Sequence, residues 1–125
     1  MAACPCGSRA AYADCCRPYL RGTHHARTAE ALMRSRYTAY VRRDEPYLLR
    51  TWDPKTRPSS LDLGGMVWLG LEILDTTAGA ATDAAGTVTF VAHHCADNGV
   101  IGELRETSRF VREGDTWQYV DGIRE

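Results

Sequence analysis

Four of the five cysteines crowd into the first 16 residues, and this cluster limits the possible folds of the N-terminal segment more than any other feature of the sequence. Thiolates are soft ligands, and zinc prefers four of them in a tetrahedron. Two closely spaced cysteine pairs joined by a short loop can close such a shell. The pattern Cys-x-Cys-x8-Cys-Cys therefore predicts a knuckle around one structural zinc ion, whose expected ligands are Cys4, Cys6, Cys15 and Cys16.

Disulfide bonds, idle reduced thiols and a redox dithiol are the other interpretations of this cluster. Disulfides need an oxidising compartment, but the first residues contain neither a basic nor an apolar part of a secretion signal. The sequence also contains no run of 18 apolar residues that would predict a membrane span. We therefore expect a cytoplasmic protein with reduced thiols, where clustered free cysteines would be prone to oxidation. The spacing differs from the Cys-x-x-Cys of redox dithiols.

The segment after the cysteines is predicted to form two helices. Between Arg27 and Arg43, apolar side chains recur at i, i+3, i+4 and i+7, as in a helix packed on a core. Thr28 can cap the start of this helix. A second, shorter helix is expected over residues 44–52, and residues 55–65 form a connector.

Four strands are predicted to follow, because apolar runs rich in β-branched residues alternate with turn sequences. Asp97-Asn98-Gly99 and Glu113-Gly114-Asp115 have the composition of hairpin turns. Helices followed by a strand meander indicate an α+β fold, in which the helices pack on an antiparallel sheet. The strands are expected near residues 67–74, 86–97, 101–113 and 116–123.

Charge is spread unevenly along the chain, although the formal net charge is only −1. Residues 1–57 carry 11 of the 15 basic and 5 of the 16 acidic side chains, a net charge of +6, whereas residues 58–125 have −7. Such asymmetry can mark a surface for nucleic acid or for an acidic partner. The two halves can equally neutralise each other on folding, so we do not expect a nucleic-acid partner.

The N-terminal segment resembles the SEC-C motif, a small zinc-binding element at the C-terminal tail of the preprotein-translocase ATPase and in many other proteins. The residues that carry the resemblance are Cys4-Pro5-Cys6-Gly7-Ser8, Tyr12 and Cys15-Cys16. At Arg9-Ala10-Ala11 the chain lacks the glycine and lysines that are usual in the motif and that help it contact an acidic partner. The resemblance implies a zinc-binding motif over residues 1–22 and a protein partner docked there.

The remaining chain resembles the bacterial YchJ-like family, which joins a SEC-C motif to a nuclear transport factor 2-like domain. This resemblance implies a cystatin-like cone over residues 23–125, in which N-terminal helices pack on a curved antiparallel sheet. Related cones often pair through the open face of the sheet, so a homodimer, with zinc serving stability alone, stays open. The resemblance to this family implies a fold but no particular reaction. The matching segments are residues 32–40, 47–48, 51–52, 106–110 and 117–122.

Such a cone encloses a pocket, and two polar features fall where its core is expected. Arg36 lies on the apolar stripe of the first helix, so its guanidinium must pair with an acid or bind an anion. Alternation along the third strand puts Glu106 and Ser108 between apolar residues on one face, and Glu106 is the obvious partner for Arg36. Polar groups framed by aromatic walls are typical of a ligand pocket. Its candidate residues are Arg36, Glu106, Ser108, Tyr37, Tyr40, Trp52, Trp117 and Tyr119.

The same residues also fit a structural role, in which a salt bridge ties helix to sheet and the aromatic residues are core. His93 and Cys95 share one face of the second strand, which permits a dyad, but His94 takes the other face. A buried Cys95 acting as a small apolar residue explains that position equally well. His24-His25 after the knuckle could bind metal adventitiously.

Two functions follow from these patterns. The first is a zinc-binding protein whose cone binds a small molecule, and the second is a protein- or ribosome-docking adaptor that acts through the knuckle and the basic N-terminal half. Whether the protein is an enzyme stays open, because the chain has no Gly-x-Ser-x-Gly, P-loop, Rossmann or His-Glu-x-x-His motif. The adaptor would need an exposed basic face, formed by Arg9, Arg17, Arg21 and Arg27.

Overall fold

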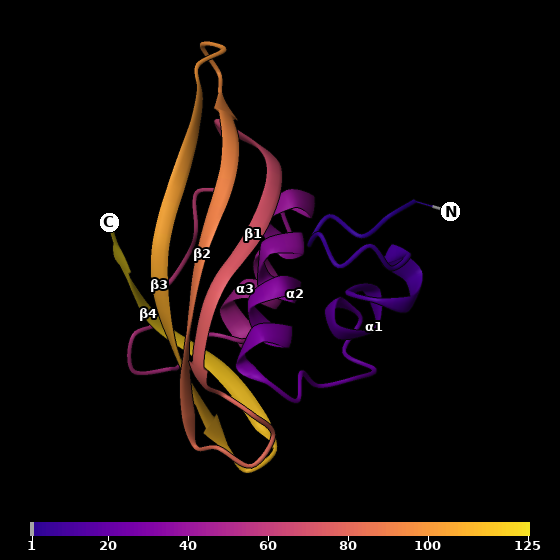
Figure 1. Cartoon of the computed structure of the whole chain (residues 1–125), viewed down its shortest axis with the longest axis vertical. Helices are drawn as coiled ribbons and strands as arrows, with labels where there is room; N and C mark the ends of the chain where they lie inside the picture. Colours follow the sequence, from indigo (N-terminus) through magenta and orange to yellow (C-terminus); the bar gives the residue numbers. More distant parts are fainter. Residues whose placement is uncertain (1) are drawn as a thin grey trace.

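The computed structural model describes residues 2–125, and its frame is a four-stranded antiparallel sheet with helices against one face (Figure 1). The strands lie in the order in which they occur in the chain, as a meander with no crossover. This α+β arrangement is the one that the sequence predicts. The strands are β1 (Met66–Ala78), β2 (Ala85–Ala96), β3 (Ile101–Glu113) and β4 (Thr116–Arg124).

The long helix α2 (Ala29–Arg42) lies along the sheet and is followed by the short helix α3 (Glu45–Arg50). The Thr28 hydroxyl accepts a hydrogen bond from the Ala31 amide at 3.0 Å, which confirms the predicted cap. Asp44 caps α3 in the same way, with its carboxylate 3.1 Å from the Tyr47 amide. Both helices therefore begin where capping residues satisfy amides that have no partner within the helix.

Strand β1 is longer than its apolar run predicts, because its polar end from Asp75 to Ala78 stays paired with β2 as far as Gly86. The other three strands match the predicted ranges within a residue or two. Register shifts interrupt the β1–β2 ladder twice and the β3–β4 ladder once. Bulges of this kind bend strands, and the sheet is curved (Figure 1).

The main core lies between the inner face of the sheet and α2. Val88, Phe110 and Trp117 rise from the strands, and Leu32 and Tyr37 meet them from the helix; all five are 4% exposed or less. Alternation puts these strand residues on one face, as expected for a sheet covered on one side. Among residues 2–125, no helix is long and apolar enough to cross a membrane.

The N-terminal segment packs against the side of α2 that faces away from the sheet (Figure 1). It contains a short 3-10 helix, η1 (Tyr12–Asp14), and α1 (Arg17–Leu20), and an isolated bridge pairs Ala3 with Ala11. Leu20 and three of the cysteines join Ala39, Tyr47 and Leu48 in a second buried cluster. The segment is therefore packed onto the helices and does not hang as a free appendage.

Candidate metal centre and cavity

The four N-terminal cysteines converge on one point. Their sulfur atoms all lie within 4.8 Å of one another, and Cys6 Sγ is 3.6 Å from Cys15 Sγ. In a tetrahedral zinc site with Zn–S bonds of about 2.3 Å, neighbouring sulfurs are roughly 3.8 Å apart. The donor set is thiolate only and closed by protein, so the cluster fits a structural metal ion and leaves no coordination position for a substrate.

Local backbone contacts bring the two cysteine pairs together. The Cys4 amide donates to Ala10 O at 2.8 Å, which folds the loop back on itself. Gly7 has φ +80°, and a Cβ there would lie 3.1 Å from the Leu71 carbonyl oxygen of β1. Only glycine suits that conformation and that close approach, which explains its place directly after Cys6.

Helix α2 contacts the cluster through two side chains. Arg34 Nη1 donates to the Cys6 carbonyl at 2.7 Å, and Thr38 Oγ1 lies 3.7 Å from Cys4 Sγ. Within the cluster, the hydrogen bond with Cys16 lowers the pKa of Cys6 to about 4, and the same bond raises the pKa of Cys16. A divalent cation bound among the sulfurs would stabilise all four as thiolates.

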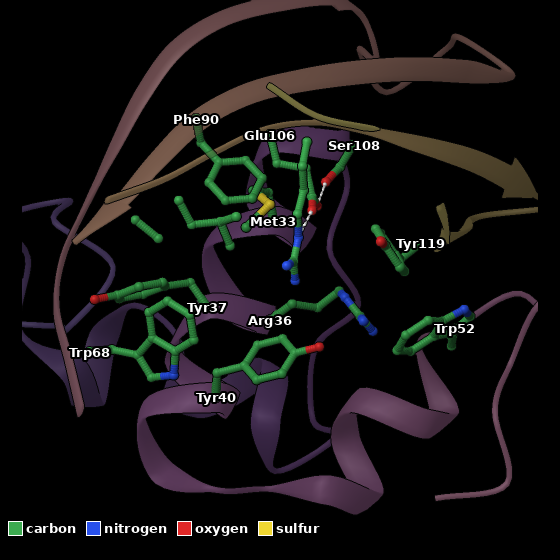
Figure 2. A pocket seen from close by; sticks show the side chains of 13 residues that line it. Met33, Arg36, Tyr37, Tyr40, Trp52, Trp68, Phe90, Glu106, Ser108 and Tyr119 are labelled. Atoms are coloured by element: carbon green, nitrogen blue, oxygen red, sulfur yellow. Dashed lines mark hydrogen bonds and ion pairs between the residues drawn. The ribbon is translucent and has the colours of Figure 1, made fainter. Parts of the chain in front are cut away.

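A cavity of about 240 Å³ lies between α2 and the inner face of the sheet (Figure 2). Side chains from α2, from the segment after α3 and from all four strands line it. Seven of the eight predicted pocket residues are among them, namely Arg36, Tyr37, Tyr40, Trp52, Glu106, Ser108 and Tyr119.

Trp117 does not line this cavity. It is 2% exposed in the main core, and its indole Nε1 donates to Arg27 O at 3.1 Å. It shares a strand face with Tyr119 but lies nearer the β3–β4 turn, where the start of α2 covers the sheet. The prediction that placed Trp117 in this wall was therefore wrong.

Arg36 crosses the cavity floor and is only 3% exposed. Its Nη1 donates to Leu48 O and to Thr51 Oγ1, both at 2.7 Å, which ties α2 to the end of α3. The guanidinium carbon lies 5.0 Å from the Trp52 ring centre and 4.5 Å from that of Tyr119. Burial lowers the pKa of Arg36, and the neighbouring tyrosines oppose this effect.

Glu106 does not pair with Arg36, so the predicted ion pair was wrong. The Ser108 hydroxyl donates to Glu106 Oε2 at 2.9 Å, and Arg124 Nε lies 3.6 Å from Oε1 (Figure 2). Arg124 is the ladder partner of Glu106 on β4. Gly122 leaves room for this carboxylate, because a Cβ there would overlap it.

The sequence analysis missed several wall residues. Trp68 stacks edge-on against Tyr37, with ring centres 6.3 Å apart, and also contacts Tyr40 and His94. Strict alternation puts Trp68 and Leu71 on opposite faces of β1, and only the bulge between them turns both towards the core, so periodicity alone could not have found Trp68. The other missed lining residues are Met33, Phe90, Ala92, Leu104 and Arg124.

The histidines and the fifth cysteine do not form a catalytic set. His93 Nε2 lies 2.8 Å from Glu72 Oε1 on the outer face of the sheet, and the Cys95 thiol donates a hydrogen bond to the neighbouring Ala96 carbonyl. His94 packs on Trp68 from the inner face, with a buried Nδ1 that has no hydrogen-bond partner within residues 2–125. No hydrogen bond links His93 to Cys95 in that range, so the structure gives the dyad no support. His24 is exposed, and its ring Nδ1 lies 3.3 Å from the Thr23 hydroxyl.

Two family models match the chain. Residues 2–18 match the SEC-C motif, and residues 28–122 match the family described as YchJ, middle NTF2-like domain. A UPF0225 protein of Streptomyces avermitilis is 54% identical over 122 residues, which cover 97% of this chain and 84% of that protein. A UPF0225 protein of Chromobacterium violaceum is 49% identical over 127 residues, covering 98% and 93%.

Two solved structures are similar over nearly the whole chain. One is the solution structure of a SEC-C motif containing protein from Rhodopseudomonas palustris, with a TM-score of 0.87, 33% identity and 98% of each chain covered. The other is the crystal structure of a SEC-C motif containing protein from Psychrobacter arcticus, with a TM-score of 0.80 and 28% identity. That match covers 97% of this chain and 81% of the other.

Proposed function

Since the chain belongs to the YchJ-like family of SEC-C proteins, as its sequence predicts, we propose that it is a zinc-binding protein whose cone binds a small molecule. The cavity between α2 and the sheet is the observation that carries this proposal. Its walls are mainly aromatic and apolar, with a few polar groups on the floor, which is the usual make-up of a ligand site. A volume of about 240 Å³ suits a ligand smaller than a typical drug.

In this proposal the zinc ion is structural. Cys4, Cys6, Cys15 and Cys16 would hold it, and its charge would stabilise four thiolates that are packed against α2. A closed tetrathiolate offers no open position, so the ion would contribute to folding and take no part in chemistry at the cavity. Reduced thiols in such a site support a cytoplasmic location.

We propose that the SEC-C part covers residues 1–22 and the cone residues 23–125. Helix α1 ends at Leu20, and Gly22 has a positive φ of 81°, which suits the end of an element. The Arg50 guanidinium reaches back to Leu20 O at 2.9 Å, so the two parts share contacts even though they are separate in sequence.

The adaptor function remains a second candidate, and one observation favours it. Arg9, Arg21 and Arg27 are exposed, while Arg17 is half-buried. A basic surface beside the knuckle suits an acidic protein partner. Charge reversal at Arg9 and Arg21 would abolish such docking, whereas it would leave ligand binding in the distant cavity unchanged.

Titration of ¹⁵N-labelled protein with small neutral aromatic compounds (indole, benzamide and 1-naphthamide) tests the cavity directly. We expect saturable shifts of the Trp68 and Trp52 indole N–H signals, because both side chains line the cavity. The Trp117 indole is the internal control, since it donates to Arg27 O outside the cavity.

A filling variant makes the test site-specific. Ala92→Leu adds bulk to a cavity-lining position, whereas Val91→Leu adds a methylene on the opposite face of the same strand. Binding should weaken at least tenfold in the first variant and stay unchanged in the second. If the compounds bind Ala92→Leu and the parent equally, the cavity is not the site at which they bind.

A further inference from the structure

We infer that the ligand of this cavity is an organic anion, a small aromatic or apolar carboxylate whose charged group binds Arg36. This inference rests on the proposed ligand-binding function and adds the chemistry of the ligand. It is carried by the hydrogen-bonding capacity and the charge balance of one buried side chain.

Arg36 has more hydrogen-bond donors than its neighbours in the structure use. A guanidinium carries five N–H groups and accepts no hydrogen bonds. Within residues 2–125, its Nη1 donates to Leu48 O and Thr51 Oγ1, and a hydrogen bond with the Tyr40 hydroxyl helps to keep its pKa up. These three acceptors do not use all five N–H groups, and no carboxylate or carbonyl in that range accepts from Nε–H or Nη2–H. Nε and Nη2 form one edge of the guanidinium fork, which matches the two oxygens of a carboxylate.

The charge of Arg36 is also unmatched. No carboxylate of residues 2–125 lies within 4.0 Å of its guanidinium, although the side chain is only 3% exposed. Within residues 2–125, aromatic rings and neutral oxygen atoms compensate this charge, namely the rings of Trp52 and Tyr119, the Leu48 carbonyl, and the hydroxyls of Thr51 and Tyr40. A buried charge without a counter-ion is costly, so an anion that binds there recovers much of that cost.

The rest of the lining does not neutralise Arg36. Its only other charged members are Glu106 and Arg124, which lie 3.6 Å apart and balance each other. Glu106 is further occupied by the Ser108 hydroxyl. The lining therefore has a net charge of +1, which favours a monoanion. A phosphate dianion would need a second buried cation, and the Arg124 side chain is 76% exposed at the edge.

The apolar walls define the body of the ligand. Met33, Tyr37, Trp68 and Phe90 line the side of the cavity away from Trp52 (Figure 2). At about 30 Å³ for each molecule of liquid water, a cavity of about 240 Å³ has the volume of roughly eight waters. One or two fused rings bearing a carboxylate would fill that volume, with the rings against Trp68 and the carboxylate at Arg36.

Two pairs of isosteric compounds test the inference on the unmodified protein at pH 7, namely benzoate with benzamide and 1-naphthoate with 1-naphthamide. Charged hydrogen bonds contribute about 1.5–3 kcal/mol, so each carboxylate should bind about tenfold to a hundredfold more tightly than its amide. The carboxylates should also shift the Arg36 Nε–H signal, and the amides should shift it little. If the amides bind as tightly as the carboxylates, the cavity is a ligand site but the anion inference is wrong. If none of the four binds, the proposed function fails as well.

Variants then locate the anion. Arg36→Gln should remove the preference for carboxylate, and Arg36→Lys should keep part of it, because lysine retains the charge but loses the fork. Arg124→Gln leaves Glu106 without its partner at the mouth, and it should reduce the preference less than Arg36→Gln does. A preference that survives Arg36→Lys intact but disappears in Arg124→Gln would move the anion to the mouth and overturn the inference. If Arg36→Gln does not fold, the Nε–H shift of the parent and the other two variants still decide the question.

Discussion

Replacing Cys16 with serine should remove the metal and destabilise the whole domain. Cys16 is 1% exposed, and its sulfur is one of the four within 4.8 Å of one another. Serine keeps the size of the side chain but is a much poorer ligand for zinc. Because structural zinc binding is coupled to folding, a three-ligand site should leave the knuckle unfolded under ordinary conditions.

The decrease in the free energy of unfolding can be estimated from the contacts that join the knuckle to α2 and α3. Leu20, 8% exposed, would become solvated, which costs about 1.5–3 kcal/mol. The hydrogen bond from Arg34 to the Cys6 carbonyl is partly exposed and adds about 1–2 kcal/mol. A total of about 3–5 kcal/mol corresponds to a fall in Tm of roughly 10–20 °C for a domain of this size.

The assay measures zinc content with a colorimetric chelator after thiol blocking, and Tm by circular dichroism. The parent should contain one zinc per chain, and Cys16→Ser close to none. Cys95→Ser is the matched control, because Cys95 lies on β2 outside the cluster and donates a hydrogen bond to Ala96 O. A Cys16→Ser protein that kept one zinc per chain and the Tm of the parent would refute the four-cysteine assignment.

Two further predictions concern buried hydroxyl groups. Ser35 Oγ and Tyr47 Oη are 2.7 Å apart in the core, so Ser35→Ala should cost about 1–3 kcal/mol by leaving the phenol without a partner, and adding Tyr47→Phe should cost little more; fully additive losses in urea unfolding would contradict this coupling. Burial raises the pKa of Tyr119 to about 12, with a smaller contribution from the charge of Glu106. The stability that this shift reflects is complete below the unfolded pKa of about 10 and is lost as the pH rises towards 12. Absorbance at 295 nm should therefore show a late tyrosine step that shrinks in Tyr119→Phe, and an unchanged titration in that variant would rule out the assignment.

The sequence predicted the features that depend on neighbouring residues. The cysteine cluster spans 13 residues, so its spacing alone predicts that the four sulfurs lie together, as they do. The cap at Thr28 and the hairpin turns are equally local. Strand β1 is longer than predicted because pairing with β2 keeps its polar end in the ladder. Local composition does not reveal such pairing.

Features that depend on register were not predictable. Glu106 lies opposite Arg124 across the β3–β4 ladder, and its carboxylate pairs with Arg124. The sequence analysis had predicted that the same carboxylate pairs with Arg36. A shift between Arg109 and Phe110 sets that pairing, and periodicity along a single strand does not reveal it. The prediction for Trp117 was wrong for a related reason. Its face was correct, but its position along the sheet brings it under the start of α2.

Helix α2 is the element that both candidate sites share. Arg34 and Thr38 contact the cysteine cluster, whereas Arg36, Tyr37 and Tyr40 line the cavity, so one helix forms a wall of each. Arg36 itself ties α2 to α3 through Nη1, while no carboxylate within residues 2–125 pairs with its guanidinium, so the same side chain fits both a structural role and a ligand-binding one. The salt bridge between helix and sheet expected from the sequence would have neutralised this charge. Because the bridge is absent from residues 2–125, the charge that it would have neutralised is the basis on which we infer an anionic ligand.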